Sequence, residues 1–127
     1  MYGAQEVVKA IGRGFNPEIA LLMLKADYCF DIISLPDFAK SPNDIVRLKG
    51  RIIGLDGKAR RTIEELSETN VSVYGKTAGI IGEVSRVPVA RRAIDMLLAG
   101  SQHANVYHWL EKQRRKFREA EVAGENV

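Results

Sequence analysis

Positively charged side chains gather around a short glycine-bounded segment, residues 54–57 (Gly-Leu-Asp-Gly). Between positions 47 and 61 there is one acid, Asp56, and six bases: Arg47, Lys49, Arg51, Lys58, Arg60 and Arg61. Glycines at both ends let the backbone turn tightly and let a ligand approach it closely. A helix that begins directly afterwards would turn its free N–H groups toward that ligand and favour negative charge. The segment therefore predicts a binding site for a phosphate-bearing ligand.

This glycine spacing is weak evidence by itself, because the sequence holds a second example, residues 79–82 (Gly-Ile-Ile-Gly). That one has apolar middle residues and no flanking bases, and we interpret it as a structural turn in a hairpin. Residues 54–57 instead lie between two predicted helices and lack the Gly-Lys-Ser/Thr ending of a P-loop, which argues against nucleotide hydrolysis. The plain alternative for them is a helix–helix turn with a solvated basic face.

No constellation of catalytic or metal-binding side chains is recognisable in the sequence. His103 and His108 are five positions apart, which differs from the i,i+4 spacing of a helical metal site. The aspartates between positions 27 and 44 fall on different predicted elements and support no two-metal site. Cys29 is the single cysteine, so no disulfide framework is available within the chain. We therefore expect no catalytic residue, no metal and no cofactor.

Basic charge is concentrated in the later part of the chain. The first 46 residues carry four bases and six acids, whereas the rest carry fifteen bases and ten acids. A locally basic surface suits a polyanionic partner. No apolar run approaches the roughly 18 residues that cross a bilayer, and the N-terminus does not resemble a signal peptide. We expect a cytoplasmic protein with no membrane partner.

Helices and strands that could position the loop follow from the apolar periodicity and from the turn residues. Helices are predicted over 2–11, 17–25, 43–50, 58–69, 85–99 and 104–119, and strands over 28–35, 71–74 and 80–84. The last two strands should form an antiparallel hairpin, and residues 120–127 should be frayed. The order strand, helix, glycine loop, helix, strand, strand, helix predicts an α+β domain.

Residues 51–63 (Arg-Ile-Ile-Gly-Leu-Asp-Gly-Lys-Ala-Arg-Arg-Thr-Ile) resemble the Ile-Gly-x-x-Gly signature of the KH domain. Residues 62–75, 80–83 and 93–100 with Val106-Tyr107 more narrowly resemble the second KH domain of the archaeal and eukaryotic Partner of NOB family of ribosome-assembly factors. The resemblance implies a type I KH fold, in which a three-stranded antiparallel sheet has helices packed on one face. Extra helices would precede and follow that domain.

Family members carry two KH modules, which bears on residues 1–25. Shifted by 86 positions, their helix–glycine–helix pattern matches the end of the chain. The chance similarity of two helical hairpins is the plain alternative. We expect the tail of a preceding, truncated KH module over 1–25, the KH domain over 26–100, a C-terminal helix over 101–120 and a disordered tail over 121–127.

The resemblance also implies that the domain clamps about four nucleotides of single-stranded RNA. Glycines 54 and 57 would admit phosphates, apolar side chains would floor a groove for bases, and the strand 71–73 would offer backbone groups to base edges. Asp56 should point away from phosphate or cap the following helix. The predicted RNA-binding residues are Lys49, Arg51, Ile52, Ile53, Gly54, Leu55, Asp56, Gly57, Lys58, Arg60, Arg61, Val71, Ser72 and Val73. Ile63 should share the groove floor, with core packing as its alternative.

By the same resemblance, the expected RNA is the 3′ region of small-subunit rRNA. Expected protein partners are the Nob endonuclease and the α subunit of initiation factor two. An alternative hypothesis is a KH-fold scaffold for protein interaction, with weak or no RNA binding at this module. The basic run over 112–118 is interpreted as an exposed helix end, with a secondary RNA contact as its alternative.

Overall fold

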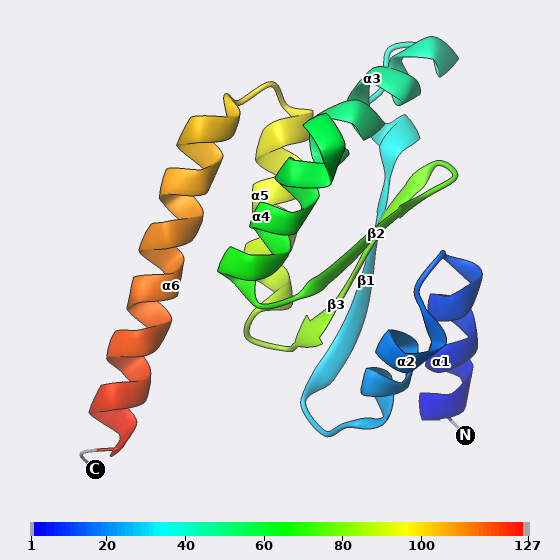
Figure 1. The fold of residues 1–127 in the computed structure, drawn as a ribbon. Coiled ribbons are helices and arrows are strands. Elements are labelled where there is room, and N and C mark those ends of the chain that lie inside the picture. The colour runs from blue at the N-terminus through cyan, green and yellow to red at the C-terminus, as the bar shows by residue number, and fades with distance from the viewer. Residues whose placement is uncertain (1, 126–127) are drawn as a thin grey trace.

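A three-stranded antiparallel sheet lies at the centre of the computed structural model, which describes residues 2–125 (Figure 1). The strands β1 (Tyr28–Ser34) and β2 (Asn70–Tyr74) both pair with the central β3 (Thr77–Glu83). The predicted hairpin of β2 and β3 is confirmed, but its turn comprises only the residues between Tyr74 and Thr77. This tight turn requires a positive φ, which Gly75 adopts readily (φ +57°) because it has no Cβ. β2 is therefore an edge strand with one side unpaired within the sheet.

Helices α3 (Pro42–Ile53), α4 (Lys58–Ser67) and α5 (Val87–Leu98) cover one face of the sheet, and α6 (His103–Glu125) packs against α4 and α5 on their outer side (Figure 1). Together with the sheet they form the main core. Alternation along the strands sends Ile33 and Ile80 to this face, where both are fully buried. The core also takes in Leu48, Ile52, Ile63, Ile94, Leu97, Val106 and Leu110. The predicted α+β class and the strand–helix order of the KH domain are confirmed.

Residues before β1 cover the opposite face of the sheet. They form α1 (Tyr2–Gly12), the short α2 (Pro17–Ala20) and the 3₁₀ turn η1 (Leu21–Leu24), in place of the single predicted helix over 17–25. The Phe15 ring packs edge-on against Phe30 of β1, with 5.7 Å between ring centroids. In Figure 1 these helices lie on the side of the sheet away from α4 and α5.

The second glycine pair does not form the predicted turn, because residues 79–82 lie inside β3. A Cβ added at Gly79 would lie 2.8 Å from a ring carbon of Phe15, and one at Gly82 would lie 2.8 Å from the Thr69 methyl carbon. The two glycines thus allow close packing on the two faces of the central strand. Glycine spacing in the sequence does not distinguish glycines that make room for a neighbouring side chain from glycines that form a turn.

The last helix is longer than predicted, since α6 continues to Glu125. The expected disordered tail is therefore helical over 121–125, and residues 126–127 lie outside the described part of the chain. Arg86 stabilises this extension: it stacks over Phe117 at 4.0 Å and pairs with Glu121 at 3.2 Å. It also stands at the N-cap position of α5. Tertiary packing of this kind prolongs helices beyond their local signals.

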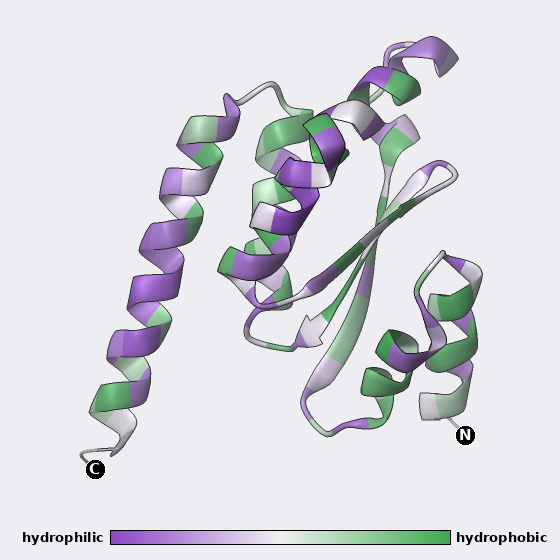
Figure 2. Ribbon diagram, viewed as in Figure 1, coloured by the Kyte–Doolittle hydropathy of each residue, from purple (hydrophilic) through white to green (hydrophobic). Residues whose placement is uncertain are grey.

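Figure 2 colours the ribbon by hydropathy and shows that α6 is largely hydrophilic along its length.

The short glycine-bounded segment forms the 3₁₀ turn η3 (Leu55–Gly57) between α3 and α4. Another 3₁₀ turn, η2 (Leu35–Asp37), precedes α3. Among the residues that the structure describes, no helix combines the length and apolarity needed to cross a membrane.

Candidate nucleic-acid interface

Gly54 ends α3 and allows the chain to turn directly into α4. Its φ of +73° and ψ of 177° form a combination that is essentially restricted to glycine. A Cβ here would lie 2.6 Å from the Ala59 Cβ and 2.8 Å from the Ala59 nitrogen. Gly57 also has a positive φ, of +75°. The loop is therefore folded tightly against the first turn of α4, as close approach of a ligand requires.

The two middle residues of the loop face solvent. Leu55 is 85% exposed, and Asp56 is exposed with a left-handed φ of +53°. Asp56 provides no side-chain cap for α4; instead, its carbonyl oxygen accepts a hydrogen bond of 2.7 Å from Arg61. The first N–H groups of α4 are thus left without a side-chain cap. Exposed Lys58 and Arg61 add positive charge beside them.

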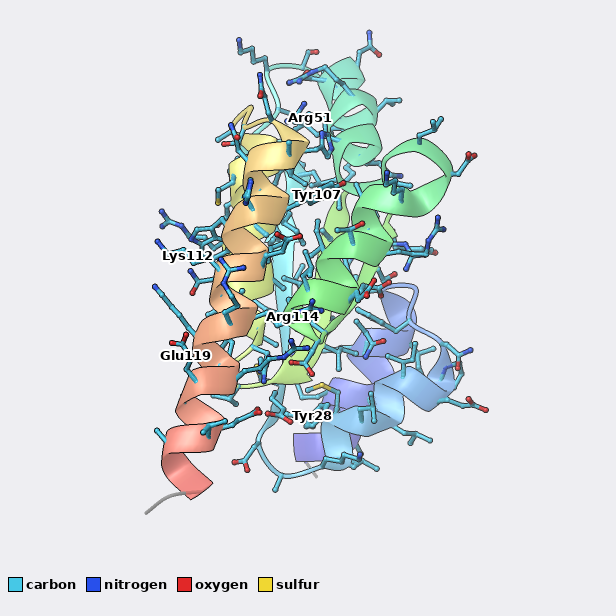
Figure 3. The ribbon with its side chains drawn as sticks, turned by 60° about the vertical axis from the view of Figure 1, so that its left-hand side comes forward. Tyr28, Arg51, Tyr107, Lys112, Arg114 and Glu119 are labelled. Atoms are coloured by element: carbon cyan, nitrogen blue, oxygen red, sulfur yellow. The ribbon has the colours of Figure 1, made fainter. Side chains whose placement is uncertain are left out.

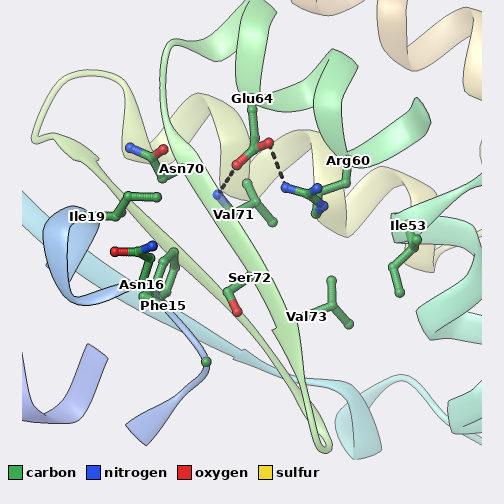
Figure 4. A pocket seen from close by; sticks show the side chains of 11 residues that line it. Phe15, Asn16, Ile19, Ile53, Arg60, Glu64, Asn70, Val71, Ser72 and Val73 are labelled. Atoms are coloured by element: carbon green, nitrogen blue, oxygen red, sulfur yellow. Dashed lines mark hydrogen bonds and ion pairs between the residues drawn. The ribbon is translucent and has the colours of Figure 1, made fainter. Parts of the chain in front are cut away.

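Glu64 joins α4 to the free edge of β2. One of its carboxylate oxygens accepts from Arg60 at 2.8 Å, and the other accepts from the Val71 backbone N–H at 2.9 Å (Figure 4). The Val71 N–H therefore points away from β3. Because orientation alternates along an antiparallel strand, the N–H and C=O of Val73 also point to this side. The predicted role of β2, offering backbone groups to a base, is geometrically available at Val73.

A cavity of about 320 Å³ lies between the loop end of α3, the side of α4 and the edge of β2. Figure 4 shows Ile53, Arg60 and Glu64 on one side and the β2 residues along the other. Of the predicted floor residues, Ile53 lines this groove, whereas Ile52 and Ile63 are fully buried in the main core. The complete lining is Gly14, Phe15, Asn16, Ile19, Ile53, Arg60, Glu64, Asn70, Val71, Ser72 and Val73.

Arg51 is directed away from the loop (Figure 3). Its guanidinium donates to the carbonyl oxygen of Leu97 at 2.7 Å and to that of Ser101, while its own carbonyl oxygen lies 2.8 Å from a ring nitrogen of His103. It thus ties the end of α3 to the connection between α5 and α6. Arg51 was predicted to contact phosphate, but its guanidinium is engaged in these hydrogen bonds within the fold. Lys49, on the same helix, is half-buried.

Replacing Arg51 with leucine should lower the free energy of unfolding by about 2 kcal/mol, because two carbonyl oxygens lose a charged donor. Urea denaturation followed by circular dichroism measures this. Arg47→Leu is the matched control: Arg47 is exposed and pairs with Asp44 at the surface, so its loss should change stability far less. Equal effects of the two substitutions would contradict the structural role of Arg51.

Other ionisable groups lie away from the groove. Asp95 on α5 and Cys29 on β1 both have pKa values that are raised chiefly by burial. Arg91 forms ion pairs with both Asp31 and Asp95. Among the side chains that the structure describes, in residues 3–124, no group of three or more His, Cys, Asp or Glu could hold a metal ion. On α6, the bases at 112, 115, 116 and 118 are exposed, whereas Arg114 is half-buried; Lys112 and Arg114 are labelled in Figure 3.

Sequence reasoning missed two parts of the groove. Glu64 lines the groove, whereas its position four residues after Arg60 indicates only an ion pair on the outer face of the helix. Residues 14–16 were assigned to a preceding helical unit, and no local signal indicates that they line the groove. Their position depends on how α1 and α2 pack on the sheet.

A model of the second KH domain of PNO1, described as a eukaryotic-type KH domain (KH-domain type I), matches residues 29–115. The chain belongs to the PNO1/Dim2 family of type I KH domains. A KH domain-containing protein of Methanocaldococcus jannaschii is 50% identical over 120 residues, which cover 94% of this chain and 53% of that protein. The pre-rRNA-processing protein pno1 of Aspergillus fumigatus is 32% identical over 118 residues, which cover 91% of this chain and 47% of that protein.

Solved structures agree with this family membership. A protein of unknown function from Aeropyrum pernix superposes with a TM-score of 0.93 at 41% identity, covering 98% of this chain and 66% of that one. Dim2p of Pyrococcus horikoshii, in a complex described as a/eIF2alpha-aDim2p-rRNA, gives a TM-score of 0.84 at 43% identity and covers 91% and 63%. The chain spans about half the length of the curated PNO1/Dim2 relatives it matches.

Proposed function

We propose that this chain binds single-stranded RNA in the groove between η3, α4 and the edge of β2. The observation that carries the proposal is the arrangement at one end of that groove. There a glycine-restricted turn leads into α4, whose N-terminus has no side-chain cap and lies beside exposed Lys58 and Arg61. Phosphates would bind at this end, and bases would lie along Ile53 and the outward-facing backbone of Val73.

The RNA that we propose is the 3′ region of small-subunit rRNA. Support comes from the relatives: curated family members are named pre-rRNA-processing or RNA-binding proteins, and the Pyrococcus horikoshii Dim2p complex contains rRNA. We further propose that the chain acts by binding rather than catalysis, and that it does so in the cytoplasm. Incubating the protein with labelled RNA and a divalent metal tests the first point, since cleavage would contradict it.

Binding is tested by fluorescence anisotropy with a labelled oligonucleotide from the 3′ end of small-subunit rRNA. The same oligonucleotide annealed to its complement is the matched control. We expect the single strand to bind at least tenfold more tightly, because paired bases cannot enter the groove. For about four neutralised phosphates, the logarithm of affinity should fall with the logarithm of salt concentration with a slope of about −3. Equal affinity for the duplex, or no binding to either, would contradict the proposal.

A protein-interaction role is the second candidate, and the complex containing a/eIF2alpha favours it. We propose the α subunit of initiation factor two and the Nob endonuclease as partners. Exposed apolar side chains on the N-terminal helices, among them Val8 (69%) and Leu24 (60%), could take part in such contacts. A loop variant separates the roles: if the chain is a scaffold, a substitution that adds charge to η3 should leave affinity for these proteins unchanged.

A further inference from the structure

The segment that precedes β1 forms one wall of the groove. A hydrogen bond of 3.1 Å from the Ser72 hydroxyl to the Arg13 carbonyl oxygen holds it along β2. A Cβ at Gly14 would lie 2.9 Å from that hydroxyl oxygen, so the backbones are in close contact. Phe15 is only 5% exposed and anchors the segment to the sheet. The wall is therefore held against β2 by a hydrogen bond and by the burial of Phe15.

This part of the groove differs in charge from the loop end. The ionic residues that line the cavity are Arg60 and Glu64, and they are paired with each other. The Glu64 carboxylate would repel a phosphate, whereas an uncharged base meets no such penalty. The remaining polar lining consists of amides and a hydroxyl: Asn16, Asn70 and Ser72. A nucleobase is thus the better occupant here.

The two asparagines offer different hydrogen-bonding groups. The Asn16 side-chain oxygen already accepts from the Glu18 N–H at 2.8 Å and caps α2, which leaves its NH₂ as a donor. The half-buried Asn70 side chain makes no hydrogen bond to the described side chains and backbone of residues 3–124, so it can use a donor and an acceptor side by side. In Figure 4 both amides lie beside Ile19 at the same end of the groove.

We propose that this end of the groove is a base-selective subsite, in which Asn70 reads the base and Asn16, from the segment before the KH domain, supports it. An asparagine amide pairs with a neighbouring donor and acceptor on the edge of a base. Asn16 presents only donors, which fit any oxygen acceptor of the nucleotide, so it adds affinity rather than base selectivity. This inference rests on the proposed RNA-binding function and extends the groove beyond the KH domain itself.

The test compares base preferences of the whole chain and its variants. Single-stranded RNA nonamers, with each of the four bases placed in turn at each position, are titrated and read by anisotropy. We expect the unchanged chain to prefer one base about tenfold over the other three at the subsite position. Asn70→Ala should reduce that preference to less than twofold and leave the preferences at other positions unchanged. Asn43→Ala, on the surface of α3, is the matched control and should change nothing.

Asn16→Ser keeps a helix-capping oxygen but removes the NH₂ donor, so α2 should remain formed. We expect it to weaken binding about fivefold for all four bases alike. Asn70→Asp is a second variant at the reading position, and it should change the base preference because a carboxylate lacks the amide donor. Thermal unfolding of each variant checks its folding.

Two results would overturn the subsite without affecting the proposed function. One is that the Asn70 variants keep the base preferences of the unchanged chain at every position. The other is that they lose affinity uniformly and keep its base preference. Absence of RNA binding by the unchanged chain would overturn the proposed function and the subsite together.

Discussion

Replacing Leu55 with aspartate should weaken binding of single-stranded RNA at least tenfold. The new carboxylate would stand beside Asp56 in the turn where phosphates are proposed to approach the backbone. Because Leu55 is 85% exposed, the folded state loses little packing, and the free energy of unfolding should change by about 0.5 kcal/mol or less. Anisotropy titrations at constant salt measure the affinity, and urea denaturation measures the stability.

Two control variants separate the effect of the position from the effect of the added charge. Val46→Asp adds the same charge at a 73% exposed apolar residue of α3, away from the loop, and should reduce affinity less than twofold. Leu55→Asn changes the side chain without adding charge and should have an intermediate effect. If Leu55→Asp binds RNA as tightly as the unchanged chain, η3 does not contact the phosphates.

A larger effect on stability is expected for Gly54→Ala. The added Cβ would meet Ala59 at 2.6 Å in a backbone conformation that only glycine adopts readily. Relief of that contact requires the turn to open, and we expect a loss of about 3 kcal/mol in the free energy of unfolding. RNA binding should fall as well, even at temperatures where the variant is fully folded.

Gly50→Ala provides the contrast within the same helix. A Cβ at Gly50 meets nothing within 4 Å, and an alanine inside a helix is favoured over glycine by about 0.5–1 kcal/mol. Stability should therefore rise slightly while RNA affinity stays unchanged. A similar loss of stability in both variants would show that the effect at Gly54 comes from helix composition rather than from the turn.

Local patterns were sufficient to predict the order of elements. Asn16-Pro17 begins a helix, with Asn16 capping through its side chain, and the two short apolar runs around Gly75 form a hairpin. The loop geometry at Gly54 also follows from local sequence, because a glycine between two helices indicates an unusual backbone conformation. These features depend on residues that are neighbours in the chain.

Features of the site that depend on tertiary packing were not predictable. Ile52 and Ile53 are adjacent and identical, yet Ile52 is fully buried in the core and Ile53 lines the groove. The direction of Arg51 depends on where α5 ends, 46 positions later in the chain. The wall made by residues 14–16 exists because Phe15 packs against β1. Charge and periodicity place residues near a site but do not say which way each side chain points.

The central claim is that RNA occupies the groove between η3, α4 and β2. Its most direct test is a titration of isotopically labelled protein with an oligonucleotide from the 3′ end of small-subunit rRNA, followed by backbone amide chemical shifts. We predict a contiguous response over residues 53–61 and 70–73, joined by residues 14–16. A response confined to α6, over residues 104–118, would contradict the claim.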